Sequence, residues 1–392
     1  MIGWQSAAVG VAALAAGLAV AAAAPHRPTD DTQILERLPS AGSKTARELH
    51  GELGRSPNNL GLALQVAKRD IELARAEGDP RYNGYAEAAL APWLNIPDPP
   101  IEVIVLRATL RQARHDFSAA LADLSKALSE DPRNAQAWLV RAVILTVEGD
   151  YPKALGNCLS LTRLADALVT AICVDGVLSL SGRAGASYDD LQKVLNDAPP
   201  RGSDAIRLWG LTVLAEIAER LGDFSAAERH FIEALALGIR DAYLLGAYAD
   251  FLLDRNRPQE ARSLLEKEVR VDPLLLRLAL AEQSLGAPEL AGHIADLAER
   301  FAEARQRGDA VHQREEARFD LHLLKQPREA LRLGLANWAV QREPWDTRLL
   351  LEAALAANEP SAATPALDWL AMSHLEDAHL HELAAQLQQS AR

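Results

Sequence analysis

The sequence predicts an all-α fold, a right-handed superhelical solenoid built from antiparallel helix pairs. Three observations predict it. Apolar residues recur at helical spacing along most of the 392-residue chain, no segment alternates apolar and polar residues as a strand does, and one helix–turn–helix pattern returns about every 34 residues. A single helix pair is too small to bury its apolar faces, so such pairs stack on their neighbours and the stack curves into a superhelix.

Composition and charge narrow the range of functions. Hydrophobic residues make up 49% of the chain and charged residues 24%, which is typical of a folded protein. The formal net charge is −13 and aromatic residues are only 5%. Binding to a phosphate backbone or to anionic lipid needs clustered Lys and Arg, and single-stranded nucleic acid needs stacking rings. We therefore expect no nucleic-acid partner and favour a basic or neutral protein partner.

The first residues differ from the rest of the chain. An uncharged run from Ala7 to Ala24 ends in small residues that a signal peptidase accepts, so residues 1–23 are expected to be a signal peptide. No Lys or Arg precedes the run, which is just long enough to span a bilayer, so an uncleaved membrane anchor is the alternative. Either reading places the body outside the cytoplasm, periplasmic or secreted in the first case and held at the inner membrane in the second. Residues 24–40 are expected to be a mobile lead-in.

Residues 135–168 show the repeated unit. Apolar residues share one face of a first helix, and Gly149 offers the left-handed conformation that ends it. Asp150 then offers a carboxylate to the free N–H groups of a second helix. Ala154 has a side chain small enough for the two helix axes to approach closely.

The same unit recurs in residues 101–134, 208–241 and 242–273. Its Trp/Leu/Gly/Tyr, Ala, Phe, Ala and Pro positions resemble those of the tetratricopeptide repeat. Looser copies extend the array over residues 41–375, and residues 376–392 have one polar face and are expected to form a capping helix.

The resemblance implies that the first helices of successive pairs line one long curved trough that holds an extended peptide or a partner helix. The first part of this groove is apolar and the later part carries carboxylates and aromatic rings, so it suits a segment with an apolar part and a basic part. Alternatively, Trp209 and Tyr243 only pack between repeats. The groove positions carried over from the family are Val105, Thr109, Leu139, Val143, Ile172, Gly176, Trp209, Thr212, Glu216, Tyr243 and Asp250.

The chain has two cysteines, Cys158 and Cys173. In an exported protein such a pair is a candidate disulfide that would close a loop of about 15 residues and stabilise the fold by about 3 kcal/mol in the chain-entropy model. The alternative is two buried thiols that pack as small hydrophobic side chains.

Motifs for chemistry are absent from the sequence. No Gly-rich phosphate loop or Gly-x-Ser-x-Gly elbow occurs, and no cofactor is expected. His374, Asp377 and His381 could share a helix face and hold a metal, although a solvated face is the simpler reading. We expect an exported, non-enzymatic scaffold that binds a protein or peptide. The alternatives are a membrane-tethered assembly factor and a hydrolase that uses the C-terminal histidines.

Overall fold

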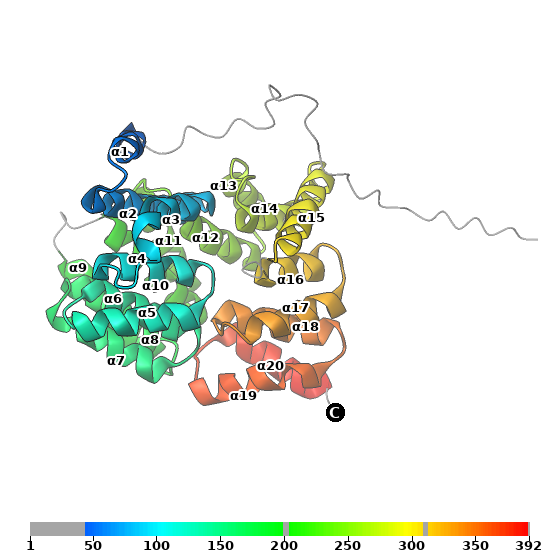
Figure 1. Cartoon of the computed structure of the whole chain (residues 1–392). Coiled ribbons are helices and arrows are strands. Elements are labelled where there is room, and N and C mark those ends of the chain that lie inside the picture. Colours follow the sequence, from blue (N-terminus) through cyan, green and yellow to red (C-terminus); the bar gives the residue numbers. More distant parts are fainter. Residues whose placement is uncertain (1–43, 199–203, 309–312, 391–392) are drawn as a thin grey trace, which may run out of the picture. The chain divides into compact units, whose positions relative to one another are not determined.

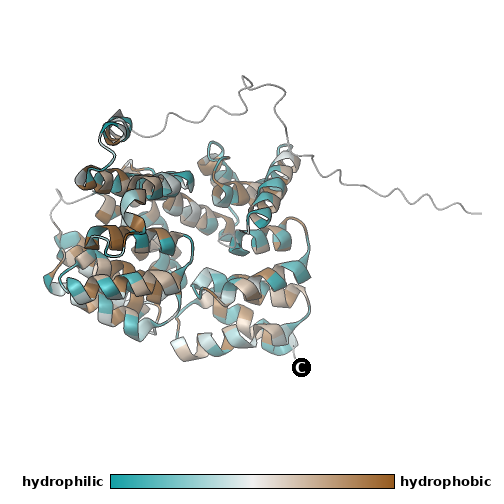
Figure 2. Cartoon of the chain, viewed as in Figure 1, coloured by the Kyte–Doolittle hydropathy of each residue, from teal (hydrophilic) through white to brown (hydrophobic). Residues whose placement is uncertain are grey.

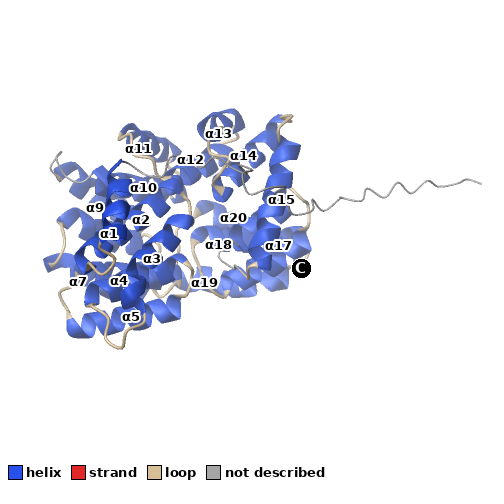
Figure 3. Ribbon diagram, turned by 45° about the horizontal axis from the view of Figure 1, so that its top comes forward, coloured by secondary structure: helices blue, strands red, loops and turns tan. Residues whose placement is uncertain are grey.

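The computed structural model describes residues 44–198, 204–308 and 313–390 (Figure 1). These residues form α-helices, two short 3-10 helices and connecting loops, with no strand in the described part (Figure 3). The expected signal or anchor at 1–23 and the lead-in at 24–40 lie outside the described residues. Within them, no helix is both long and apolar enough to cross a bilayer.

Consecutive helices pair as hairpins, after a first helix α1 (Lys44–Arg55). The pairs are α2 (Leu60–Glu77) with α3 (Arg81–Leu94), α4 (Ile101–Ala113) with α5 (Phe117–Glu130), α6 (Ala135–Val147) with α7 (Tyr151–Ser160), α8 (Ala167–Leu178) with α9 (Ala184–Asp197), α10 (Asp204–Arg220) with α11 (Phe224–Ala236), α12 (Ala242–Asp254) with α13 (Pro258–Leu265), α14 (Asp272–Leu285) with α15 (Leu290–Gln306), α16 (Gln313–His322) with α17 (Pro327–Trp338), and α18 (Pro344–Ala356) with α19 (Thr364–Ser373). A last helix, α20 (Ala378–Ser390), packs on α18. The predicted all-α array of stacked helix pairs is confirmed.

The corner between α6 and α7 has the predicted chemistry. Gly149 has φ of +78°, and the Asp150 carboxylate accepts a hydrogen bond from the Lys153 N–H at the start of α7. Ala154 is fully buried, because its methyl group lies where α6 and α7 meet. In Figure 2 most helices carry both apolar and hydrophilic residues, as amphipathic helices of a stacked array do.

Cys158 of α7 and Cys173 of α8 form a disulfide with a Cα–Cα distance of 5.5 Å. The bridge joins the second helix of one pair to the first helix of the next. It therefore ties two neighbouring repeats together covalently.

The last repeats pack back onto the middle of the array. The N–H of Arg342 donates to the carbonyl of Val147, at 2.7 Å, across a gap of almost two hundred residues. Tyr151 of α7 and Trp369 of α19 lie with ring centroids 6.1 Å apart. These rings belong to one apolar core that includes α6, α7 and α8 together with α16 to α20.

A second long-range contact joins the start of the array to its middle. The Arg240 guanidinium, just before α12, donates to the carbonyl of Ala76 in α2 at 2.7 Å. Gly78, which ends α2, lies against Val271 and Ala242. The sequence predicts one long curved trough, but these two contacts tie distant repeats of the array to one another.

Candidate partner-binding groove

A cavity of about 470 Å³ lies where α2 faces the starts of α6, α8 and α10. We call it the apolar cavity, because most of its lining side chains are hydrocarbon or aromatic. Such a mixture of apolar walls and a few polar groups is typical of sites that bind a partner group. Its lining consists of Glu72 and Arg75 of α2, Ala135, Gln136 and Leu139 of α6, Leu161, Ala165 and Val169 around the start of α8, and Ala205, Ile206 and Trp209 of α10.

Further along α10 the concave face becomes polar. Glu216 lies two helical turns after Trp209 on the same stripe. Its carboxylate accepts a hydrogen bond of 2.5 Å from the hydroxyl of Tyr243 in α12, whose ring is 58% exposed. Burial raises the pKa of Glu216. Because a large ring stays open to solvent beside this carboxylate, the pair is available to a partner.

Glu219 lies one turn further on. Burial and the neighbouring carboxylates of Asp254 and Asp250 raise the pKa of Glu219 to about 8. Burial raises the pKa of Glu343, which interacts with Glu216, to about 7, although the Arg314 guanidinium opposes that shift. A positive group from a partner would favour the ionised form of these carboxyls, so the region suits a cation.

Asp250 has a different role. Its side chain is 2% exposed and forms ion pairs with Arg277 of α14 at 2.6 Å and with Arg318 of α16 at 2.7 Å. Burial would raise the pKa of Asp250, but the two guanidinium groups hold it below its ordinary value. Asp250 therefore joins three helices inside the array instead of offering a free carboxylate to a partner.

The remaining predicted groove residues divide into two groups. Leu139 and Trp209 line the apolar cavity, and Val143 is 36% exposed one turn beyond Leu139. Val105, Ile172 and Thr212 are buried, while Thr109 and Gly176 are partly covered. The predicted disulfide pair lies outside the cavity lining.

Close helix packing explains the buried group. An added Cβ at Gly210 of α10 would lie 3.3 Å from the Ile172 side chain of α8, so neighbouring first helices touch where the family pattern expects an open face. The hydroxyl of Thr212 donates back to the Leu208 carbonyl of its own helix. The buried groove positions therefore pack between neighbouring repeats and do not line the groove.

Sequence reasoning missed part of the cavity wall. Ile206 and Val169 could have been found, since each precedes a predicted groove position by about one helical turn. Arg75 could not, because α2 lies beside α10 only in the tertiary structure, where Arg75 pairs with Asp241 just before α12.

The C-terminal histidines have structural partners. His374 ends α19 with φ of +55°, the Nε2 atom of His381 lies 2.9 Å from the Leu375 carbonyl, and Asp377 accepts a hydrogen bond from the Leu380 N–H. No group of three or more His, Cys, Asp and Glu side chains suited to a metal ion occurs in the described part of the chain.

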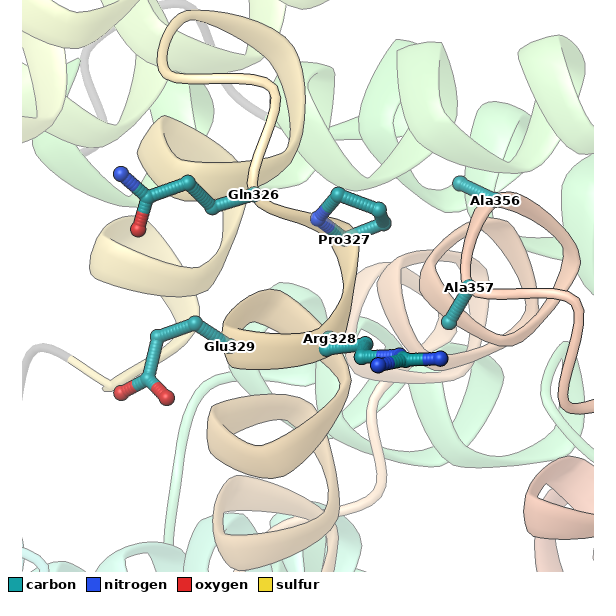
Figure 4. A pocket seen from close by; sticks show the side chains of 6 residues that line it. All are labelled: Gln326, Pro327, Arg328, Glu329, Ala356 and Ala357. Atoms are coloured by element: carbon teal, nitrogen blue, oxygen red, sulfur yellow. The ribbon is translucent and has the colours of Figure 1, made fainter.

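A second hollow, at the start of α17 and the end of α18, is lined by Gln326, Pro327, Arg328, Glu329, Ala356 and Ala357. Figure 4 shows Gln326 and Glu329 pointing away from the two alanines. Glu329 is already paired with Arg332 in the same helix, and the Arg328 side chain is 86% exposed. These side chains do not converge on a common point, so we assign this hollow no function.

The stacked hairpins with glycine corners and small alanine contacts define a helical repeat protein. The family model of the tetratricopeptide repeat matches residues 105–167 and 212–275, so these two segments are tetratricopeptide repeats. No curated protein matches it.

Solved structures are similar at low identity. A tetratricopeptide repeat protein from Parabacteroides merdae is 16% identical with a TM-score of 0.38, and the match covers 74% of this chain and 99% of that one. The APC/C hetero-tetramer Cut9-Hcn1 is 14% identical with a TM-score of 0.41, over 88% of this chain and 86% of that one. These values are too low to carry an argument about function. The repeat fold indicates a scaffold for protein–protein interaction.

Proposed function

We propose that this protein is an exported, non-enzymatic scaffold that binds an extended peptide segment through an apolar side chain and a nearby basic side chain. One observation carries the proposal: α10 presents Trp209 to the apolar cavity and Glu216 to the polar stretch beyond it. Seven helical residues span about 10 Å, which about three residues of an extended peptide also span. The peptide's basic residue is therefore expected about three positions from its apolar one.

Selection of peptides from a random library on the full chain tests this proposal. Enriched peptides are expected to carry Lys or Arg about three positions from a large apolar residue. Trp209→Ala should weaken their binding by about tenfold or more, because a buried aromatic side chain often dominates an interface. Glu216→Gln with Glu219→Gln should weaken basic peptides selectively.

The matched control is Glu260→Gln on α13, a carboxylate 55% exposed and paired with Arg257 outside the groove. Peptides that bind the Trp209 and Glu216 variants as tightly as the native chain would show that they bind elsewhere. Asp250 is not a useful test position, because its substitution would break a buried ion pair.

Export is the second part of the proposal. The uncharged run at Ala7–Ala24 supports it, and so does the disulfide, because such bonds persist in oxidising compartments. The alternative, an assembly factor tethered to the inner membrane, keeps the same run as an anchor. Sequencing the N-terminus of the mature chain separates the two: a start near Ala24 removes the anchor, and an intact Met1 retains it.

The hydrolase alternative has less support. Catalysis by the C-terminal histidines would need a metal, and His381 and Asp377 are engaged in the turn before α20. A metal-dependent hydrolytic activity that His381→Ala abolishes would favour it over the scaffold.

A further inference from the structure

We propose that the α2–α3 hairpin is a lid that can move away from the apolar cavity, of which α2 forms one wall, and that Arg240 and Asp241 form the latch that keeps it in place. The inference rests on the proposed function only in treating the cavity as the partner site. Movement of the lid depends on the contacts of α2 and can be measured without a partner.

Helix α2 is one wall of the cavity. Glu72 and Arg75 of α2 face Leu139 of α6 and Trp209 of α10 across it. The other walls belong to the consecutive pairs of the array, α6 to α10, which are joined through the Cys158–Cys173 bridge and continuous cores. Displacement of α2 would therefore open the cavity and leave its remaining walls in place.

The free end of the lid is held mainly by charged groups. Arg240 donates to the carbonyl of Ala76 at 2.7 Å and pairs with Glu77 at 2.9 Å and with Glu268. The Arg75 guanidinium pairs with Asp241 at 3.3 Å. The bonds of Arg75, Ala76 and Glu77 come from the last turn of α2 and lead to the segment just before α12. Glu268, in the turn before α14, holds Arg240 from the other side.

The hinge of the lid, where the hairpin joins α4, is held by apolar contacts. There α2, α3 and α4 share an apolar core that includes Ala67, Leu90, Leu94, Val103 and Leu106. The latch opposite it has close apolar contacts of Gly78 with Val271 and Ala242. Beside them are ion pairs in which Arg75, Glu77 and Arg240 are 33% to 56% exposed, whereas Glu268 is 19% and Asp241 is 4% exposed. Exposed ion pairs contribute little and are screened by salt, whereas apolar burial is not. Opening is therefore expected to break the latch and keep the hinge.

Thiol labelling measures this opening directly. Both native cysteines are in the disulfide, so Val169→Cys places a single free thiol in the cavity wall. In the native background a bulky maleimide should label it more slowly than a fully exposed thiol, because Val169 is only partly exposed. Arg240→Ala should speed labelling by about tenfold, since the guanidinium makes several charge-assisted bonds at once. Roughly 0.5 M salt should speed labelling of the native background but not of Arg240→Ala.

Two controls separate a lid from general loosening. Arg262→Ala breaks the Arg262–Glu289 ion pair elsewhere in the array and should leave labelling unchanged. Ala353→Cys places the thiol on α18, where the native side chain is fully buried in the core, and Arg240→Ala should not speed its labelling. Equal acceleration at positions 169 and 353 would indicate general loosening, and no acceleration at position 169 would mean that the hairpin does not move. Either result would contradict the lid. The peptide selection would still test the groove, because it does not depend on the lid.

Discussion

Asp250 lies between two arginines from different helices, Arg277 and Arg318. Removing three charged groups from water costs free energy, and only close ion pairs and hydrogen bonds offset that cost. The Arg318 guanidinium also lies over the Trp345 ring, with 4.8 Å between the guanidinium carbon and the ring centroid. The cluster thus fixes α12, α14 and α16 relative to one another.

Replacing Asp250 is predicted to destabilise the fold. Asp250→Asn keeps the shape of the side chain but leaves two largely buried guanidinium groups without an anion, so the free energy of unfolding should fall by about 3 kcal/mol. Chemical denaturation measures the loss. The control is Asp98→Asn, which removes a carboxylate 88% exposed and paired with Lys126, and should cost less than about 0.5 kcal/mol. Equal effects would mean that the buried pair is not structural.

At the scale of the elements, the glycines at two hairpin corners share a backbone conformation but differ in how closely other side chains pack against them. Gly149 and Gly222 both have positive φ, +78° and +81°. An added Cβ at Gly149 would lie 2.9 Å from the Trp369 indole nitrogen, whereas nothing lies within 4 Å of one at Gly222. The first corner is therefore constrained by its conformation and by a contact, and the second by its conformation alone.

This difference gives a matched pair of variants. Gly222→Ala should cost about 1 kcal/mol, the usual penalty for a left-handed alanine. Gly149→Ala should cost more, because the new methyl group must also push α19 away from the corner. Thermal unfolding of both proteins compares the penalties. A loss at Gly149 no larger than that at Gly222 would show that the contact with Trp369 yields easily.

For the whole molecule, the array gathers carboxyls from helices far apart in sequence. Glu219 lies near Asp254 of α12, and Glu343 lies near Glu216 of α10. Each ionised carboxylate in these pairs makes its neighbour harder to ionise, because like charges repel. Stability should therefore depend on pH in the neutral range, where isolated carboxyls no longer titrate.

The sign follows from proton binding. The pKa of Glu219 rises from its ordinary value of 4.5 to about 8 in the folded protein. Between these values the folded state keeps a proton that the unfolded state has lost, so the free energy of unfolding falls as pH rises. Glu219→Gln should reduce the fall in stability between pH 5 and pH 8. Denaturation curves at both pH values measure it, with the exposed Glu233→Gln as the charge control.

An unchanged pH dependence in Glu219→Gln would mean that this carboxyl is solvated in the folded protein. The same result in both variants would assign the slope to other groups. A smaller change of stability with pH in Glu219→Gln, but not in Glu233→Gln, is the result that supports electrostatic coupling among these carboxyls.

The sequence by itself determined the helix pairs, their corners and their period, because each depends on residues within about one repeat of one another. Gly149, Asp150 and Ala154 act on neighbours a few positions away. The same local reasoning placed Trp209 and Leu139 at the cavity and Glu216 on the stripe beyond Trp209. Only the tertiary structure decided that Asp250 is buried, that α2 forms one wall of the cavity and that the last repeats return to α6. Those features join residues such as Arg240 and Ala76, 164 positions apart, and helical periodicity specifies which face of a helix is apolar but not which distant helix will cover it.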